Sequence, residues 1–339
     1  MARRKPFALV VLALLAAAGC SQPAPETAKP AGAAFPVGLV FDIGGRGDKS
    51  FNDAAFAGLT RAQQELGIRF TTLETSEGSD REAQLRQLAS GDSKLIFGVG
   101  FLFTDDVRNL AKEFPDKKFA CIDYTVTPND TLPPNLVALK FRENEGSFLV
   151  GALAAWLSKT HKVGFVGGME IPLIRKFQAG YVAGAKAADP KVDVLVKYAG
   201  TTGAAFKDPT KGKELGLAEY HAGADIIFHA SGSTGLGVFE AARELKKLAI
   251  GVDSDQYLTA DPKVKDVIMT SMLKKVDVAV YDFITQVNDD KFTAGTTTYD
   301  LAKDGVGYAT SGGQVDDIKT QLEDAKAKII SGEIKVPTK

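Results

Sequence analysis

The stretch that decides the fold is VGLVFDIGGRGDKSFNDAAFAGLTRA, residues 37–62, because a similar stretch, VGFVGGMEIPLIRKFQAGYVAGAKAA, follows at residues 163–188. Each begins with a short apolar run, passes through a turn and continues with the spacing of an amphipathic helix. Chance matches of Gly and Ala between two such units are common, but two similar lobes are the economical interpretation. Aligned without gaps, Gly38, Phe51, Gly58 and Ala62 fall on Gly164, Phe177, Gly184 and Ala188.

Short β-branched runs alternate with amphipathic helical patterns along almost the whole chain. This alternation predicts an α/β fold in which helices cover both faces of parallel sheets. The predicted strands are residues 37–41, 70–74, 95–99, 119–122, 137–139, 163–166, 192–198, 225–228, 249–252 and 267–270. The predicted helices include residues 50–66, 80–88, 143–158, 174–188, 213–221 and 235–246.

The length of the chain predicts two lobes. About 300 residues follow the N-terminal segment, which is more than one hydrophobic core usually holds. We assign residues 35–141 to an N-terminal lobe and residues 142–275 to a C-terminal lobe. A later segment, at about residues 276–300, is expected to return to the N-terminal lobe. The lobe of residues 301–339 is left open.

The N-terminus has the pattern of an export signal. Three basic residues precede twelve apolar residues, 7–18, and Gly19-Cys20 follows. This pattern is typical of a secretory signal over residues 1–19, and a membrane-spanning helix would need about 20 apolar residues. The ending is similar to a bacterial lipobox, so we expect lipidation at Cys20, with an ordinary signal peptide as the alternative. Residues 20–34 are rich in Pro and Ala and predict a flexible linker between the lipid and the fold.

The composition excludes several classes of protein. The formal net charge is −1, so no nucleic-acid partner is expected. Besides Cys20, Cys121 is the only cysteine, and the three histidines are well separated along the chain. The sequence therefore predicts no disulfide, no metal site and no cofactor.

Acidic residues follow several predicted strands directly. The runs FACID and AIGVD, one in each half, end in Asp123 and Asp253, and Asp42 follows the first predicted strand. Ser231-Gly232 follows the strand at residues 225–228. In doubly wound sheets the ligand binds beyond the carboxyl ends of the strands. Two facing lobes would therefore place all of these residues around one cleft.

The glycine-rich turn before the first helix is not a phosphate loop. Asp48 separates Gly47 from Lys49 and puts a carboxylate where the phosphate would lie. Residues 46–48 also match the Arg-Gly-Asp adhesion tripeptide, but so short a match recurs by chance. A turn that presents carboxylates is the remaining interpretation.

The helix that follows this turn is expected to start at Ser50. Ser50 is predicted to cap the helix, with Asp53 completing a weak capping box. Phe51 is then expected to point towards the cleft, where an aromatic ring among acids suits a flat ligand rich in N–H and O–H donors. The alternative is that Phe51 is a hydrophobic staple at the helix start.

The motif D-x-G-x-x-x-D-x-S-F-N, residues 42–52, resembles the signature of the basic membrane protein family. These are bacterial lipoproteins that include purine nucleoside receptors feeding ABC transporters. The resemblance extends over nearly all of the mature chain and implies a two-lobed periplasmic-binding-protein fold of type I, the sugar-binder type. The segments similar to later family motifs are IPLIRKFQAGYVAGA from Ile171, TKGKELG from Thr210, GSTGLGVFEAA from Gly232, IGVDSDQ from Ile250 and TSMLKKVDVAVY from Thr270.

The resemblance also implies ligand contacts. Asp42 would bind the ligand, Phe51 would stack on the base, Asp123 would be a cleft acid and Asp253 would hold ribose hydroxyls. The second stacking ring would be Phe206, with Phe177 as a competitor. A cleft lysine would be Lys274 or Lys275, and we favour Lys275. Asn52 and Gly232 lie within the matching motifs and complete the predicted set.

The function that the resemblance implies is capture of purine nucleosides by a monomeric lipoprotein for an ABC permease. A receptor for a sugar or another small polar solute on the same fold is the first alternative. A nucleoside-processing enzyme is the second, because clustered carboxylates can carry out acid–base chemistry. The sequence has no evident Ser-His or Cys-His arrangement, so we expect a binding protein without catalytic activity.

Overall fold

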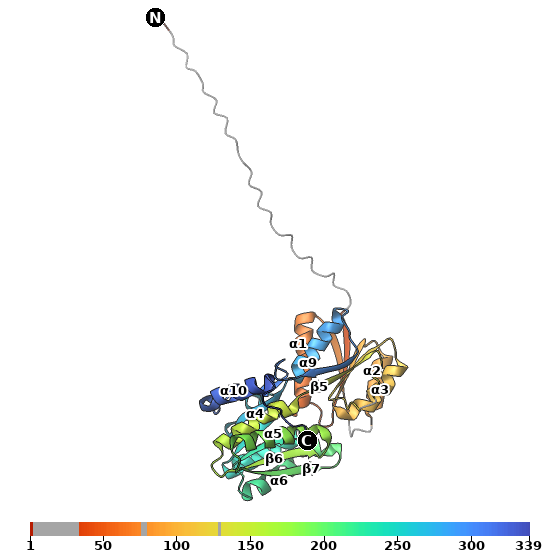
Figure 1. Cartoon of the computed structure of the whole chain (residues 1–339). Coiled ribbons are helices and arrows are strands. Elements are labelled where there is room, and N and C mark those ends of the chain that lie inside the picture. The colour runs from red at the N-terminus through yellow and green to blue at the C-terminus, as the bar shows by residue number, and fades with distance from the viewer. Residues whose placement is uncertain (3–33, 76–79, 128–129) are drawn as a thin grey trace. The chain divides into compact units, whose positions relative to one another are not determined.

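The computed structural model describes residues 1–2, 34–75, 80–127 and 130–339. Cys20, the predicted export signal beyond residue 2 and nearly all of the predicted linker lie outside the described residues. Residues Ala34–Lys339 form one compact unit that holds every described helix and strand (Figure 1). Within the described part of the chain, no helix is long and apolar enough to cross a membrane.

The strands form two six-stranded sheets, which confirms the predicted α/β fold. Every neighbouring pair in the first sheet is parallel. In the second sheet only β12 runs antiparallel to its neighbour, β10. The first sheet contains β1 (Pro36–Phe41), β2 (Arg69–Glu74), β3 (Leu95–Val99), β4 (Lys118–Ile122), β5 (Leu136–Phe141) and β11 (Gly295–Tyr299). The second contains β6 (Lys162–Met169), β7 (Asp193–Gly200), β8 (Ile226–Ala230), β9 (Leu248–Asp253), β10 (Ile268–Lys274) and β12 (Val306–Tyr308).

The helices flank these sheets mostly in pairs. The close pairs are α1 with α9, α2 with α3, α4 with α5, and α6 with α7 (Figure 1). We call each sheet with its helices a lobe. The helices are α1 (Phe51–Leu66), α2 (Arg81–Ser90), α3 (Thr104–Glu113), α4 (Glu143–Leu157), α5 (Pro172–Ala188), α6 (Pro209–His221), α7 (Thr234–Leu245), the short α8 (Gln256–Thr259), α9 (Val276–Asn288) and α10 (Lys319–Ile330).

The two lobes have the same strand order, and the two repeated sequence segments occupy equivalent positions in them. The first sheet reads β2-β1-β3-β4-β5-β11 and the second reads β7-β6-β8-β9-β10-β12. The matched glycines Gly58 and Gly184 lie where α1 meets α9 and where α5 meets α4. A Cβ at Gly58 would lie 2.5 Å from the carbonyl oxygen of Asp277, and one at Gly184 would lie 2.0 Å from that of Phe148. Both helix pairs are therefore too close for a side chain at this position.

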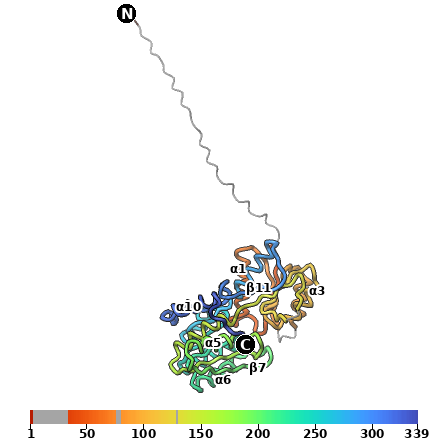
Figure 2. The backbone as a smooth tube through the Cα atoms, viewed as in Figure 1, coloured from red at the N-terminus to blue at the C-terminus, as the bar shows by residue number. Residues whose placement is uncertain are grey.

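The chain passes between the sheets three times. After β5 it enters the second sheet, after β10 it returns to the first as β11, and it then ends in the second sheet as β12. Figure 2 shows β11, in blue, among segments from the beginning of the chain. The C-terminal segment is fastened near the first of these crossings, because Asn144 Nδ2 donates to the carbonyl oxygen of Val336 at 3.0 Å. Such crossings are the places where two lobes can bend relative to each other.

The central strands are buried on both faces. In β1, Leu39 and Phe41 face one hydrophobic core, Val40 faces another, and all three are at most 1% exposed. Burial on both faces explains why the strand reads as a continuous apolar run rather than an alternating one. Each such side chain contributes about 1.5–3 kcal/mol on burial. These cores hold the ends of the strands, and the polar residues that follow them, in fixed positions.

Candidate ligand-binding site

A pocket lies where the carboxyl ends of the strands of the two sheets meet. The centres of water molecules have about 60 Å3 available in it, and since one water needs about 10–15 Å3 of such volume, only a few waters fit. Its walls come from both lobes. Among the lining residues are Asp42, Phe51, Asn52, Phe101 and Asp123 from the first lobe and Phe177, Phe206, Gly232, Asp253 and Lys274 from the second. The structure therefore brings all the predicted ligand contacts except Lys275 to one place.

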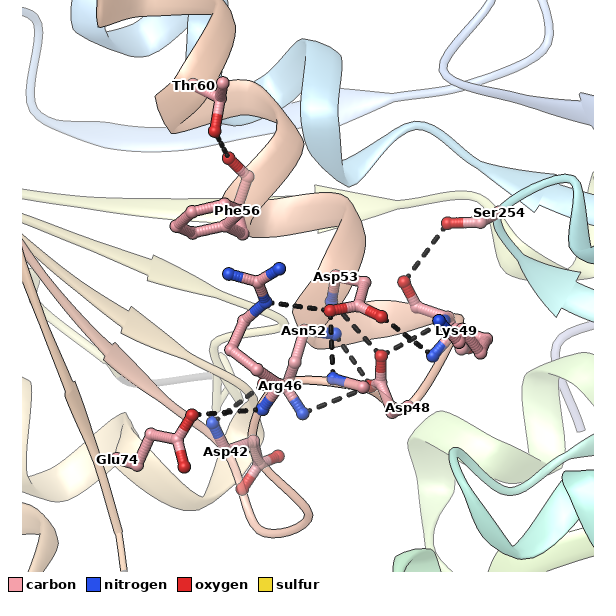
Figure 3. Close-up of polar contacts among 12 residues, drawn as sticks. Asp42, Arg46, Asp48, Lys49, Asn52, Asp53, Phe56, Thr60, Glu74 and Ser254 are labelled. Atoms are coloured by element: carbon pink, nitrogen blue, oxygen red, sulfur yellow. Dashed lines mark hydrogen bonds and ion pairs between the residues drawn. The ribbon is translucent and has the colours of Figure 1, made fainter. Parts of the chain in front are cut away.

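The turn between β1 and α1 is organised by Asp48. Its carboxylate accepts hydrogen bonds from the backbone N–H groups of Ser50 at 3.0 Å, Asn52 at 2.8 Å and Asp53 at 3.1 Å. It also accepts one from Asn52 Nδ2 at 3.2 Å. Figure 3 shows these contacts converging on Asp48. Asp48 thus satisfies the free N–H groups at the start of the helix.

The capping prediction for Ser50 and Asp53 is wrong, because Asp48 takes the role. The Ser50 side chain makes no capping hydrogen bond. Asp53 instead accepts from the backbone N–H groups of Gly47 and Lys49, both at 3.0 Å, and from Arg46 Nε at 2.8 Å (Figure 3). With its Asp48 3% exposed, the Arg-Gly-Asp tripeptide cannot present its carboxylate to an adhesion receptor.

Asp42 is held at the end of β1 by short-range contacts. Its Oδ1 accepts the N–H of Ile43 at 2.8 Å, and its own N–H donates to Asn52 Oδ1 at 2.9 Å. A Cβ at Gly100 would lie 2.1 Å from Asp42 Oδ2, so glycine at this position makes room for the carboxylate. Removal from water raises the pKa of Asp42 to about 7, against the lowering effect of the Ile43 hydrogen bond.

A chain of charged side chains starts at the pocket lining with Asp123 and Lys274, continues to the buried Glu143 and ends at the partly exposed Lys176. Lys274 Nζ lies 2.5 Å from Asp123 Oδ2 and 3.7 Å from Glu143 Oε1, and Glu143 Oε2 lies 3.1 Å from Lys176 Nζ. Burial alone would lower the pKa of Lys274, but Asp123 and Glu143 outweigh it and raise the pKa. Among the described groups, Asp123 Oδ1 has no hydrogen-bond partner. This oxygen is available to a donor in the pocket.

The lysine in the pocket is Lys274, not the predicted Lys275. Lys274 is the last residue of β10 and is 2% exposed. Lys275 precedes α9, and its backbone N–H donates to the carbonyl oxygen of Gly305. Neighbouring residues of a strand point to opposite faces, so only one of the two can reach the pocket.

Asp253 occupies the same position in the second lobe as Asp123 does in the first. Asp253 is the last residue of β9 and Asp123 directly follows β4, and both have positive φ, 64° at Asp253 and 61° at Asp123. Asp253 Oδ2 accepts a hydrogen bond from Ser50 Oγ at 2.6 Å, across the interface of the lobes. Burial raises the pKa of Asp253 to about 7, against the lowering effects of Lys274 and Ser50.

Four aromatic rings line the pocket. Lys274 Nζ lies 4.9 Å from the ring centroid of Phe51 and 5.6 Å from that of Phe177. Phe101 and Phe206 meet edge to face with centroids 6.3 Å apart, one from each lobe. Sequence reasoning missed Phe101, which begins the single 3₁₀ turn after β3. Its position after a buried strand is the signal that could have indicated it.

Gly232 and its neighbours hold the backbone of Phe206. Ser233 Oγ donates to the carbonyl oxygen of Phe206 at 3.1 Å, and Thr234 Oγ1 donates to that of Ala205 at 2.8 Å. A Cβ at Gly232 would lie 2.9 Å from the Phe206 oxygen, and its φ of 57° also favours glycine. Gly232 therefore supports the position of Phe206 through the backbone.

The pocket offers a small molecule hydrogen-bond acceptors, aromatic faces and a cation. Carboxylates that act as hydrogen-bond acceptors stand next to aromatic faces and one lysine, a set that suits a flat polar ligand. In the described ranges, no group of three or more His, Cys, Asp and Glu side chains could hold a metal ion.

Two similar lobes with a pocket between the carboxyl ends of their strands define a solute-binding protein of the type I periplasmic fold. A solved structure of a solute-binding protein of an ABC transporter system from Aeropyrum pernix superposes with a TM-score of 0.78. It is 31% identical and covers 90% of this chain and 94% of its own. The family model described as ABC transporter substrate-binding protein, PnrA-like, matches residues 35–339. The chain belongs to this family, which confirms the resemblance found in its motifs.

Relatives with curated names support the same assignment. The CD4+ T-cell-stimulating antigen of Listeria monocytogenes is 38% identical over 324 residues, 90% of this chain and 88% of the relative. The ABC transporter nucleoside-binding protein BmpA of Lactococcus lactis is 33% identical over 352 residues, 98% of this chain and 97% of the relative. This chain is accordingly a substrate-binding protein whose partners are a small molecule and an ABC permease.

Proposed function

We propose that the protein captures purine nucleosides in the pocket between its lobes and delivers them to an ABC permease without altering them. The observation that carries this proposal is the combination of aromatic rings with buried carboxylates around one narrow space. A purine has two faces for stacking, and a nucleoside has ribose hydroxyls and ring N–H groups for acceptors. The printed name of the Lactococcus lactis relative, a nucleoside-binding protein, supports the same ligand class.

Phe51 and Phe206 are the rings that we assign to the base. Phe206 is half-buried, whereas Phe177 is 3% exposed and packs against Phe228 with ring centroids 6.5 Å apart. A ring fixed in the core has little face left for a ligand, so Phe206 is the better candidate. Stacking on an aromatic ring contributes about 1–3 kcal/mol for each base.

The polar groups divide between the two parts of a nucleoside. We assign Asp253 to the ribose hydroxyls, because an ionised carboxylate accepts from two neighbouring hydroxyls. Asp123 Oδ1 and Lys274 together offer an acceptor and a donor, which suits the edge of a purine. Asp42 adds a further acceptor at the end of β1. Asn52 acts through Asp42 and Asp48, to which its side chain is bonded.

Ligand entry requires the lobes to separate. The pocket has space for only a few waters and its walls come from both lobes, so a nucleoside does not fit until the lobes move apart. Bending at the three crossings between the sheets would open it with little loss of contact inside either lobe. A closed form that buries the ligand also gives the permease a surface that differs from that of the open form.

The experiment that tests this function is mass spectrometry of the small molecule that co-purifies with the protein from its native host. The expected molecule is an intact purine nucleoside. A free sugar would replace the proposal with a sugar receptor. Release of free base from added nucleoside, with or without divalent metal, would show an enzyme instead.

A further inference from the structure

Ser50 connects the two lobes next to the ligand pocket. It is fully buried, and its Oγ donates to Asp253 Oδ2 at 2.6 Å, across 203 residues of sequence. A second contact runs the other way, because Ser254 Oγ donates to the carbonyl oxygen of Ser50 at 3.1 Å (Figure 3). The start of α1 in the first lobe is thus bonded to the end of β9 in the second.

The hydroxyl of Ser50 is free for this contact because Asp48 caps the helix. Asp48 supplies the acceptor that a serine at this position normally provides. The helix therefore does not need the Ser50 side chain, which points out of the first lobe. In a lobe taken alone, the hydroxyl would have no function in capping.

We propose that Ser50 is a positioning residue that fixes the Asp253 carboxylate for the ligand and fastens the lobes when they close. The hydrogen bond occupies Oδ2 and so sets the rotation of the carboxylate, leaving Oδ1 for the ligand. Because Ser50 and Asp253 belong to different lobes, the bond forms when the lobes close, with or without a ligand, and breaks when they separate. The assignment of a nucleoside to this site rests on the proposed function, but the contact itself does not.

The Ser50 bond also favours the ionised form of Asp253. A donor to a carboxylate stabilises its charge, and the other groups that act on Asp253 are Lys274, Asp123 and Asp48. Lys274 likewise favours the charge, whereas the two acids oppose it. Removing the hydroxyl therefore raises the pKa of Asp253 further.

The test compares three alanine variants by calorimetric titration with guanosine over a range of pH. Ser50→Ala removes both the link between the lobes and the partner of Asp253. Ser254→Ala removes only the hydrogen bond between the lobes to the carbonyl oxygen of Ser50, and it leaves the partner of Asp253 in place. Ser158→Ala is the matched control, because Ser158 Oγ donates to the Asp225 carboxylate at 2.7 Å within the second lobe and outside the pocket.

Ser50→Ala is expected to weaken binding about tenfold or more at high pH, since a hydrogen bond to a charged group is lost. It is also expected to move the midpoint of the pH dependence to higher pH. Ser254→Ala should weaken binding by less and leave the midpoint in place, and Ser158→Ala should change neither. Unchanged affinity in Ser50→Ala, or weaker binding with an unmoved midpoint, would overturn the positioning role.

A measurement without ligand separates this inference from the proposed function. The titration of the Asp253 carboxyl carbon, followed by NMR, should move to higher pH in Ser50→Ala whichever ligand the protein takes. If the wild type binds no nucleoside but this shift is seen, the proposed function fails and the Ser50 contact stands. Ser50→Cys, which keeps a weak donor, should give an intermediate shift and replaces the alanine variant if that variant does not fold.

Discussion

Nucleoside binding should weaken as the pH falls from about 8 to about 6. Burial raises the pKa of Asp42 and of Asp253 to about 7 in the closed pocket. Ligand hydroxyl and N–H groups donate to ionised carboxylates. A protonated Asp42 or Asp253 must therefore lose its proton before the ligand binds. The affinity is therefore highest above pH 7 and decreases as the pH drops through this value.

The magnitude follows from mass action. For one carboxylate with a pKa of about 7, the ionised fraction falls from about nine-tenths at pH 8 to about one-tenth at pH 6. The affinity then changes about tenfold, or about 1.4 kcal/mol, for each carboxylate. If both Asp42 and Asp253 must be ionised, the loss is about a hundredfold.

Calorimetric titration with adenosine measures this effect, because adenosine itself does not titrate in this range. Asp42→Asn serves as the matched variant, since it keeps the shape of the side chain and removes one of the two protons. Its affinity should depend on pH about half as steeply on a logarithmic scale. Binding that stays constant or strengthens on acidification would contradict this prediction, because it would show that the ligand uses the protonated acids.

Three further predictions concern single substitutions. Phe51→Ala should weaken binding of all purine nucleosides together by about 1–3 kcal/mol, whereas unchanged affinity would make the ring only a staple for α1. Glu219 is fully buried without a partner for either carboxylate oxygen among the described groups, and burial raises its pKa to about 9. The free energy of unfolding of the wild type should therefore fall as the pH rises from about 4.5 to about 9. At pH 7 the free energy of unfolding of Glu219→Gln should exceed that of the wild type by about 3 kcal/mol. The same pH dependence of thermal unfolding in both proteins would contradict this. Cys20→Ser should move the protein from the membrane fraction to the soluble fraction, and unchanged fractionation would rule out a lipid at Cys20.

The regular part of the fold could be predicted because burial leaves a clear pattern. A central parallel strand such as β1 is apolar on both faces, and the repeat at residues 163–188 marks the second lobe. The edge strands β11 and β12 carry no such pattern, since GTTTY and VGY are short and partly exposed. Their pairing depends on where the chain returns after β10, which only the tertiary structure determines.

Site residues could be predicted where they lie directly at the end of a strand that the sequence shows. Asp42, Asp123 and Asp253 could be placed because the ends of their strands were visible in the sequence. The choice between Lys274 and Lys275 failed because the predicted strand ended at residue 270, whereas β10 continues to Lys274. Without the true end of the strand, the alternation of its side chains could not be followed to the lysine.

The role of Ser50 was hidden for a different reason. The rules for helix starts favour Ser50, which directly precedes the helix, and its actual partner, Asp253, lies in the other lobe. Phe101 was missed in the same way, because its significance depends on Phe206 across the pocket. Contacts between lobes are not encoded in local patterns.

The most direct test of the central claim is calorimetric titration of the wild-type protein with guanosine, adenosine and inosine beside free ribose. We expect the nucleosides to bind more tightly than ribose by about 2–6 kcal/mol, because only they can use the two stacking rings at about 1–3 kcal/mol each. This difference corresponds to a ratio of about thirtyfold or more in Kd. Ribose binding as tightly as guanosine, or no binding of any purine nucleoside, would show that the protein is not a purine nucleoside receptor.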